Sequence, residues 1–440
     1  SAGANKPESS ATMNKRLLIG LLAALPLALL SACGGGSDGN DASVRLVNAS
    51  AGYESLDLYV DDTLEISSID FGAASGYTNV TAGDVDKVFT AADSTTTLLT
   101  KSDNLAASAK YTIVAFGAEG ALRSVNFADD EDAAKSGETK VGVYNAAVGA
   151  GTLDIYLTGE DESLESSEPI HASVAESSSS GSGYVAVDAG TYRLRITAAG
   201  DTSDVRLDLS GVTLSSTKVL NLVTTTGNGG VLINAIGIVQ DGEVTPYLNT
   251  YARARLVPAV ANGGQVAASL GATELATAAQ SPSIGLYALV PAGTMTLQTS
   301  VDGTNLPDQS VTLAAGADVT VLVTGTSPAT ATASVVADDN RLPTVASRYK
   351  LRLVHASPAL ADKSLSMAVA YTTVSTGLAF GAASDFSVLT SGTGIQIDVS
   401  APGTGNFYSN TDVTFAANGV YTVFIFDSDN GPTGVISNAR

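Results

Sequence analysis

Clusters of carboxylates are the groups in this chain whose spacing could do chemistry, and the chemistry they indicate is calcium binding. Hard cations take oxygen ligands from acidic loops, and Asp427-Ser428-Asp429-Asn430-Gly431 begins like such a loop. It lacks the distal glutamate of an EF-hand, and its last three residues are also typical of a hairpin turn. The candidate ligands in this loop and in two further acidic clusters are Asp427, Asp429, Asn430, Asp129, Asp130, Glu131, Asp338 and Asp339. Two interpretations stay open, calcium sites and solvated turns.

Imidazole and thiol groups are too few for most catalytic or redox centres. The 440 residues contain two histidines, His171 and His355, one cysteine, Cys33, and no tryptophan. A zinc site of the usual kind needs three or four His or Cys ligands. A Cys-x-x-Cys-His haem attachment cannot be written with one cysteine. The sequence therefore predicts no such cofactor and no electron-transfer role.

Two similar short segments carry an acid and an aromatic residue on one face. They are Leu56-Asp57-Leu58-Tyr59-Val60 and Leu153-Asp154-Ile155-Tyr156-Leu157. Strand alternation places each aspartate opposite the aliphatic residues and facing solvent. A glycan hydrolase needs a second acid ~5 to 9.5 Å away, and no motif brings one there. Tyr59 and Tyr156 share the face of the acids and are candidate ligand-contact residues.

The elements that must position these residues recur four times along the chain. Each copy opens with a similar strand, and these strands are Val44-Arg45-Leu46-Val47-Asn48-Ala49, Val141-Gly142-Val143-Tyr144-Asn145-Ala146, Ala254-Arg255-Leu256-Val257-Pro258-Ala259 and Leu351-Arg352-Leu353-Val354-His355-Ala356. Their starts lie 97, 113 and 97 residues apart. A period near 100 residues is long enough for each copy to enclose its own core, which disfavours a solenoid with a shared core.

An aromatic residue stands six positions before a glycine in every copy. The pairs are Tyr77 and Gly83, Tyr184 and Gly190, Tyr287 and Gly293, and Phe386 and Gly392. This spacing predicts a strand, a tight turn with positive φ at glycine, and a returning strand. We interpret the aromatic residues as core anchors.

The repeat also assigns roles to the two histidines. The positions equivalent to His355 hold Asn48, Asn145 and Pro258, so we expect His355 to close a loop by hydrogen bonding rather than to act in catalysis. His171 falls in a polar insertion of the second copy, residues 159–183, and is expected in a solvated loop.

Short alternating strands with frequent turn signals and no long helical periodicity predict an all-β protein of four tandem immunoglobulin-like antiparallel β-sandwich domains. The expected boundaries are 43–139, 140–249, 250–347 and 348–440. The linkers are short and include Pro246 and Pro343, so adjacent domains should have little freedom to swing.

The opening strand of the fourth copy, with Ser357 and Pro358 after it, resembles the start of a bacterial surface-lipoprotein module, the domain-of-unknown-function family 4397. The first and second copies share this opening strand. In both, the second strand also contains the Asp and Tyr of the family pattern. The third copy, with Pro258, joins the family only through the internal repeat. The resemblance implies a β-sandwich on exported, often lipid-anchored proteins, and it implies no reaction.

The segment before the repeats has the organisation of a secretory leader. A basic start at Met13-Asn14-Lys15-Arg16 precedes an apolar stretch, residues 17–30, and then Cys33. This stretch is shorter than the ~20 residues of a membrane span and contains Pro26. Leu30-Ser31-Ala32-Cys33 resembles the lipobox of bacterial lipoproteins, which implies acylation of Cys33 after cleavage. The expected segments are 1–12, an upstream extension or cloning remnant, 13–32, the signal peptide, and 33–42, a Gly/Ser-rich tether.

The acidic balance limits the partners. The formal charge of the chain is −22, and loss of residues 1–32, with three basic and one acidic side chain, leaves −24. We therefore expect no nucleic acid partner and no electrostatic docking on an anionic bilayer. Attachment to the membrane would depend on the acyl chains of Cys33.

These observations predict a non-enzymatic, lipid-anchored protein of the bacterial cell envelope that presents its domains for binding, adhesion or envelope structure. Gly34 after Cys33 favours the outer membrane, by resemblance to enterobacterial sorting. One alternative is a secreted hydrolase of glycan or peptide with carboxylates from loops. Another is a subunit of an extracellular filament or adhesion layer, joined through sheet edges. The macromolecular partner and the oligomeric state stay open.

Overall fold

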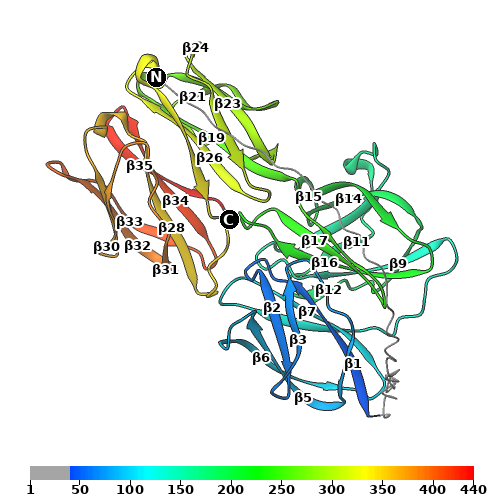
Figure 1. Cartoon of the computed structure of the whole chain (residues 1–440). Helices are drawn as coiled ribbons and strands as arrows, with labels where there is room; N and C mark the ends of the chain where they lie inside the picture. Colours follow the sequence, from blue (N-terminus) through cyan, green and yellow to red (C-terminus); the bar gives the residue numbers. More distant parts are fainter. Residues whose placement is uncertain (1–39) are drawn as a thin grey trace, which may run out of the picture. The chain divides into compact units, whose positions relative to one another are not determined.

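The computed structural model describes residues 40–440. Within this part of the chain the regular structure consists of β-strands and four single-turn 3₁₀ helices, and the strands gather in four β-sandwiches (Figure 1). The 3₁₀ helices are Leu164–Ser166, Ala261–Gly263, Pro328–Thr330 and Pro358–Leu360. None of the helices in the described residues has the length and apolarity to cross a membrane. We number the sandwiches modules 1 to 4.

Module 1 is built from two four-stranded sheets, ordered β4-β1-β7-β8 and β3-β2-β5-β6. Its strands are β1 (Asp41–Ala49), β2 (Ser55–Val60), β3 (Thr63–Asp70), β4 (Thr78–Thr81), β5 (Gly83–Ala91), β6 (Thr97–Leu105), β7 (Lys110–Phe116) and β8 (Arg123–Ala128).

Module 2 repeats this plan with extra edge strands. One sheet is β12-β9-β16-β17-β18, with β13 also paired to β9, and the other is β11-β10-β14-β15. Its strands are β9 (Glu138–Asn145), β10 (Leu153–Thr158), β11 (His171–Val174), β12 (Ser178–Ser179), β13 (Val185–Asp188), β14 (Gly190–Ala198), β15 (Asp201–Leu214), β16 (Lys218–Thr226), β17 (Ile233–Val239) and β18 (Val244–Tyr247).

Module 3 has the sheets β22-β19-β26-β27 and β21-β20-β23-β24, with β25 paired to β23. Its strands are β19 (Tyr251–Val260), β20 (Gln265–Leu270), β21 (Thr273–Gln280), β22 (Ala288–Pro291), β23 (Gly293–Val301), β24 (Thr304–Asn305), β25 (Gln309–Leu313), β26 (Asp318–Gly325) and β27 (Thr332–Asp338).

Module 4 has the sheets β31-β28-β34-β35 and β30-β29-β32-β33. Its strands are β28 (Arg348–His355), β29 (Leu365–Val369), β30 (Thr372–Leu378), β31 (Ser387–Thr390), β32 (Gly392–Ala401), β33 (Gly405–Phe415), β34 (Val420–Ser428) and β35 (Gly431–Asn438). The predicted opening strand and late β-prone strand are thus present in all four modules.

The sheet that holds the opening strand is mixed rather than antiparallel. In every module that strand pairs in parallel with the late β-prone strand, as β1·β7, β9·β16, β19·β26 and β28·β34. Between these two strands the chain forms strands of both sheets, and a parallel pair of this kind needs such a long crossover connection. The sequence prediction of purely antiparallel sheets was wrong for this pair.

Each module encloses its own apolar core between its two sheets. In module 1 this core includes Val44, Leu46, Leu56, Leu58 and Phe89, all fully buried. Modules 2, 3 and 4 have equivalent but separate clusters. Four self-contained β-sandwiches, rather than a solenoid, are therefore confirmed for the described residues.

The aromatic-glycine spacing marks a change of sheet and not a hairpin. Gly83 begins β5 in one sheet, whereas β4, just before it, belongs to the other. Gly83 and Gly293 have φ of 121°, a conformation that favours glycine. The predicted positive φ is thus confirmed at these two positions, and the predicted returning strand within the same sheet was wrong.

Candidate functional site

The mixed sheet of each module is buried on both faces. In β1, Val44 and Leu46 face the core of module 1, while Val47 and Ala49 point to the other side and are also 0% exposed. The side chains on both faces of this strand are apolar and buried, so the second face must also pack against apolar residues.

Modules cover these second faces in pairs. The cluster between modules 1 and 2, here the first paired face, consists of Val47, Ala49, Val114, Phe116, Tyr144, Ala146, Val223, Ile236 and Ile238. The cluster between modules 3 and 4, the second paired face, consists of Val257, Ala259, Leu322, Val354, Ala356, Phe424 and Phe426. The same strand positions contribute to both, so the pairing is itself a repeated feature.

Modules 2 and 3 are joined differently. No hydrophobic core cluster of the described residues combines these two modules. Hydrogen bonds join their loops instead, with the Gly229 amide donating to the Gly316 carbonyl (2.7 Å) and Asn228 Nδ2 to the Ala315 carbonyl (3.0 Å).

One arginine position clamps each paired face. Arg45 of module 1 donates from Nη1 to the Gly242 carbonyl (2.7 Å) and from Nη2 to the Val239 carbonyl (2.9 Å) of module 2. Arg352 of module 4 donates from Nη1 to the Ala337 carbonyl (2.8 Å) of module 3. Val239 and Ala337 occupy equivalent strand positions, opposite Leu220 and Val319.

The repeated aromatic residues lie in this junction and not in the module cores. Their side chains are half-buried, and arginine guanidinium groups lie over the rings of Tyr77, Tyr287 and Phe386 at 4.5 to 4.9 Å. Such stacking is a cation–π interaction. The prediction of core anchors was wrong, because these residues stand on the outer side of the mixed sheet next to the arginines.

A buried ionic network sits at the second paired face. Asp338 of module 3 accepts hydrogen bonds from Tyr287 Oη (2.5 Å) and Thr320 Oγ1 (2.6 Å), and its carboxylate contacts the Arg352 guanidinium of module 4. The Asp338 side chain is 0% exposed and that of Arg352 3%. Burial raises the pKa of Tyr287, so its hydroxyl stays protonated and donates.

Asp129 is the equivalent residue of module 1, and it lacks an arginine partner from module 2. Tyr77 Oη and Thr112 Oγ1 donate to its Oδ2, each at 2.7 Å, whereas Oδ1 is buried with no partner among the described residues. The position of module 2 that matches Arg352 holds Gly142, and the Tyr184 ring fills the space of a side chain there. Burial therefore raises the pKa of Asp129.

The other predicted calcium ligands are engaged in local contacts or point to solvent. Glu131 pairs with Lys140 and accepts through its carbonyl from Gln240 (2.8 Å). Burial opposes ionisation of Asp339, but hydrogen bonds from Arg341 and Lys350 lower its pKa to about 2.

In the last acidic loop, Asp427 accepts from the Ala359 amide at 3.0 Å and from Ser357 Oγ. Asp130, Asp429 and Asn430 are exposed. Within the described residues no group of three or more His, Cys, Asp or Glu side chains is arranged to hold a metal.

The acids and tyrosines of the second strands do not form an exposed surface. Asp57 and Asp154 are buried and accept the amides of Ser68 and Ser173, both at 2.7 Å. Both amides belong to residues with positive φ, so the carboxylates stabilise irregular backbone in the neighbouring strands β3 and β11. Tyr156 is 3% exposed and Tyr59 half-buried. The prediction that the aspartates point outward was wrong, and Tyr156 is not available as a contact residue.

Both histidines are bound to the main chain. His355 Nε2 lies 3.2 Å from the Leu360 carbonyl and 3.3 Å from that of Lys363, so the loop-closing role predicted for it is present. His171 is 1% exposed on β11, with Nε2 3.0 Å from the Val141 carbonyl. The prediction that His171 lies in a solvated loop was wrong, because the insertion forms edge strands of module 2.

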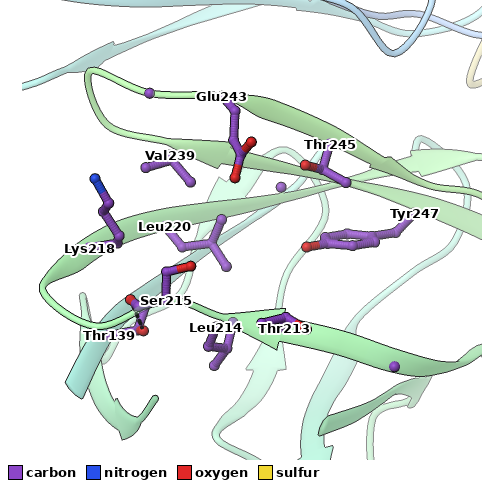
Figure 2. Close-up of a pocket in the computed structure, with 13 residues that line it drawn as sticks. Thr139, Thr213, Leu214, Ser215, Lys218, Leu220, Val239, Glu243, Thr245 and Tyr247 are labelled. Atoms are coloured by element: carbon purple, nitrogen blue, oxygen red, sulfur yellow. Dashed lines mark hydrogen bonds between the residues drawn. The ribbon is translucent and has the colours of Figure 1, made fainter. Parts of the chain in front are cut away.

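A pocket opens between the two sheets of module 2 (Figure 2), with a volume of about 470 Å³. Glu243 and Tyr247 point into it over Leu220, and Lys218 lies at its rim. Burial and the neighbouring Glu243 raise the pKa of Tyr247. The pocket contains one carboxylate, so it does not supply the acid pair of a glycoside hydrolase.

A second pocket, of about 410 Å³, lies where loops of modules 1 and 2 meet the linker 341–346. Leu342 of that linker packs against Gly149, where a Cβ would come within 3.0 Å of its side chain.

Cys33 lies outside the described residues, so the structure does not bear on its acylation.

The fold and these paired faces define a tandem β-sandwich protein. Residues 42–156 and 252–362 match the model of the family described as "Domain of unknown function (DUF4397)", and because these segments cover more than half of the chain, it belongs to that family. Each segment begins in the first module of a pair and ends in the second. Module 3 is thus matched directly by the family model, whereas the sequence pattern had connected it to the family only through the internal repeat.

No curated protein matches the sequence significantly. Among solved structures, the Bacillus anthracis TIE protein is similar at 10% sequence identity with a TM-score of 0.16, over 88% of this chain and 68% of that one. A TM-score of this size is too low to indicate a shared overall fold.

Proposed function

We propose that the protein is a non-enzymatic component of the bacterial cell envelope, anchored by acyl chains on Cys33, that holds its modules in stiff pairs to present their loops to a macromolecular partner. The observation that carries this proposal is the second buried face of each mixed sheet. A face of this kind restricts the relative motion of two domains.

The disposition of the reactive groups supports a scaffold rather than an enzyme. Both histidines bind backbone carbonyls, and the buried carboxylate of Asp338 serves an inter-module network. Hydrolysis of glycan or peptide substrates by the purified protein, lost on Glu243→Gln, would overturn the non-enzymatic assignment.

The anchor is tested with Cys33→Ser in the full chain, followed by membrane fractionation of the expressing bacteria. We expect the wild type in the membrane fraction and the variant in the soluble fraction, because the net negative charge of the chain opposes electrostatic retention on an anionic bilayer. Equal membrane retention of both proteins would contradict an acyl anchor. Mass spectrometry of the released protein shows whether the thiol carries lipid.

A further inference from the structure

Module 1 contains a buried lysine at a position where a core residue is expected. On β5, Val85 and Phe89 face the core and are 3% and 0% exposed; Lys87 stands between them on the same face and is also 0% exposed. Burying an ammonium group is unfavourable, so this side chain must have specific partners.

Those partners come from both sheets. Lys87 Nζ lies 2.5 Å from Oδ1 of Asn126 on β8, in the opposite sheet, and 2.5 Å from Oδ2 of Asp103 on the adjacent strand β6. The amine thus touches the carboxamide of one residue and the carboxylate of another between the two sheets. Burial lowers the pKa of Lys87, which favours the nucleophilic neutral amine.

The other modules show that the fold does not require these polar residues. Strand register places Leu194 and Leu297 at the position of Lys87, four residues after the glycine that begins each strand. Val212 and Val311 correspond to Asp103, and Val335 and Ile436 correspond to Asn126. Module 1 therefore holds three reactive groups together where its sister modules have mainly aliphatic side chains.

We propose that Lys87 and Asn126 form an intramolecular amide bond that joins the two sheets of module 1, with Asp103 as the proton carrier. The amine attacks Cγ of Asn126, and Asp103 transfers a proton from the attacking nitrogen to the departing amide nitrogen. The Cγ–Nδ2 bond breaks and ammonia leaves, so one amine and one primary amide give one secondary amide and one ammonia. The reaction needs no oxidant or cofactor, and a chain with one cysteine has no intrachain disulfide for this purpose.

Peptide mass spectrometry of the purified full-length protein, denatured and digested with trypsin, tests this directly. The amide blocks cleavage after Lys87, so we expect a branched peptide in which residues 46–101 are joined to residues 124–135. Its mass should be lower than the sum of the two linear peptides by one ammonia, about 17 Da. Separate linear peptides 46–87, 88–101 and 124–135 in the wild type would overturn the proposal and leave Lys87 as an ion-paired residue.

Two variants give the matched comparison. Asn126→Ala removes the acceptor, and the linear peptides 46–87 and 88–101 should then appear. Lys101→Arg changes the neighbouring lysine, whose Nζ is 3.8 Å from Asp103 Oδ1, and should keep the branched peptide. Loss of the branched peptide in Lys101→Arg would mean that Lys101, and not Lys87, forms the amide bond, and this would overturn the proposal. Should Asn126→Ala fail to fold, the wild-type digest still decides the proposal.

Discussion

At the scale of single residues, Asp129 and Asp338 show how one position can have opposite energetics in two module pairs. Both accept a tyrosine and a threonine hydroxyl. Only Asp338 also contacts an arginine of the neighbouring module. The carboxylate is therefore paired at the second paired face and unpaired at the first.

Replacement by asparagine should separate the two sites. Asp338→Asn leaves Arg352 buried without its counter-charge, and we expect a loss of about 3 kcal/mol or more in unfolding free energy. Asp129→Asn removes a buried charge that has no partner and should change stability by less than about 1 kcal/mol. Urea denaturation of the two variants measures both values. A larger loss in Asp129→Asn than in Asp338→Asn would contradict the proposed roles.

The same comparison predicts a pH dependence. Burial raises the pKa of Asp129 in the folded protein, so the folded state binds its proton more tightly than the unfolded chain does. The resulting stabilisation is complete below the unfolded pKa, about 3.9, and is lost as pH rises through the folded value. Wild type should therefore gain stability relative to Asp129→Asn as pH falls from 8 towards about 4. A difference that is independent of pH would show that Asp129 does not titrate in this way.

At the scale of elements, the loop after the opening strand depends on one side chain that binds backbone carbonyls. Asn48 Nδ2 donates to the Tyr53 and Ile69 carbonyls, both at 3.1 Å, as His355 Nε2 does to two carbonyls in module 4. The residue types differ, but both place a nitrogen donor at the same strand end.

Substitutions at His355 test this equivalence. His355→Asn keeps a donor and should cost less than about 1.5 kcal/mol, while His355→Ala leaves buried carbonyls unpaired and should cost about 2 to 4 kcal/mol. Thermal unfolding at constant pH gives both differences. Equal losses in the two variants would mean that His355 acts through its volume and not through hydrogen bonding.

The strands themselves were largely predictable from sequence, whereas their second face was not. Repeats such as Val44–Ala49 and Leu351–Ala356 gave the position of the opening strand in each module. Val47 and Val354 already depart from the alternation of a half-exposed strand, but the residues that cover them belong to a different module. Local periodicity contains no information about such a partner.

Lys87 is a polar residue whose contacts could likewise not be predicted from the sequence. The pattern Val85-Asp86-Lys87-Val88-Phe89 places the lysine on the apolar face of a strand, which is an unusual position for a charged side chain. Its partners Asp103 and Asn126 belong to two other strands, and only the register of both sheets brings them together. The sequence pattern therefore indicates that Lys87 is exceptional, but it does not identify the groups that it contacts.

At the scale of the whole molecule, the described residues form two pairs of modules. Each pair is held by an apolar face and an arginine clamp, and modules 2 and 3 are joined by loop hydrogen bonds. Pairs of this kind should open as units, because exposing the mixed sheet of one module also exposes that of its partner.

The most direct test of the paired modules is hydrogen exchange followed by mass spectrometry on full-length Val354→Asp. Val354 lies in the second paired face, 2% exposed, and a buried unpaired carboxylate there should weaken the contact between modules 3 and 4. We predict faster exchange in β28 and β34 and also in β19 and β26 of the neighbouring module, with modules 1 and 2 unchanged. Faster exchange confined to module 4 would contradict the claim that the modules act in pairs.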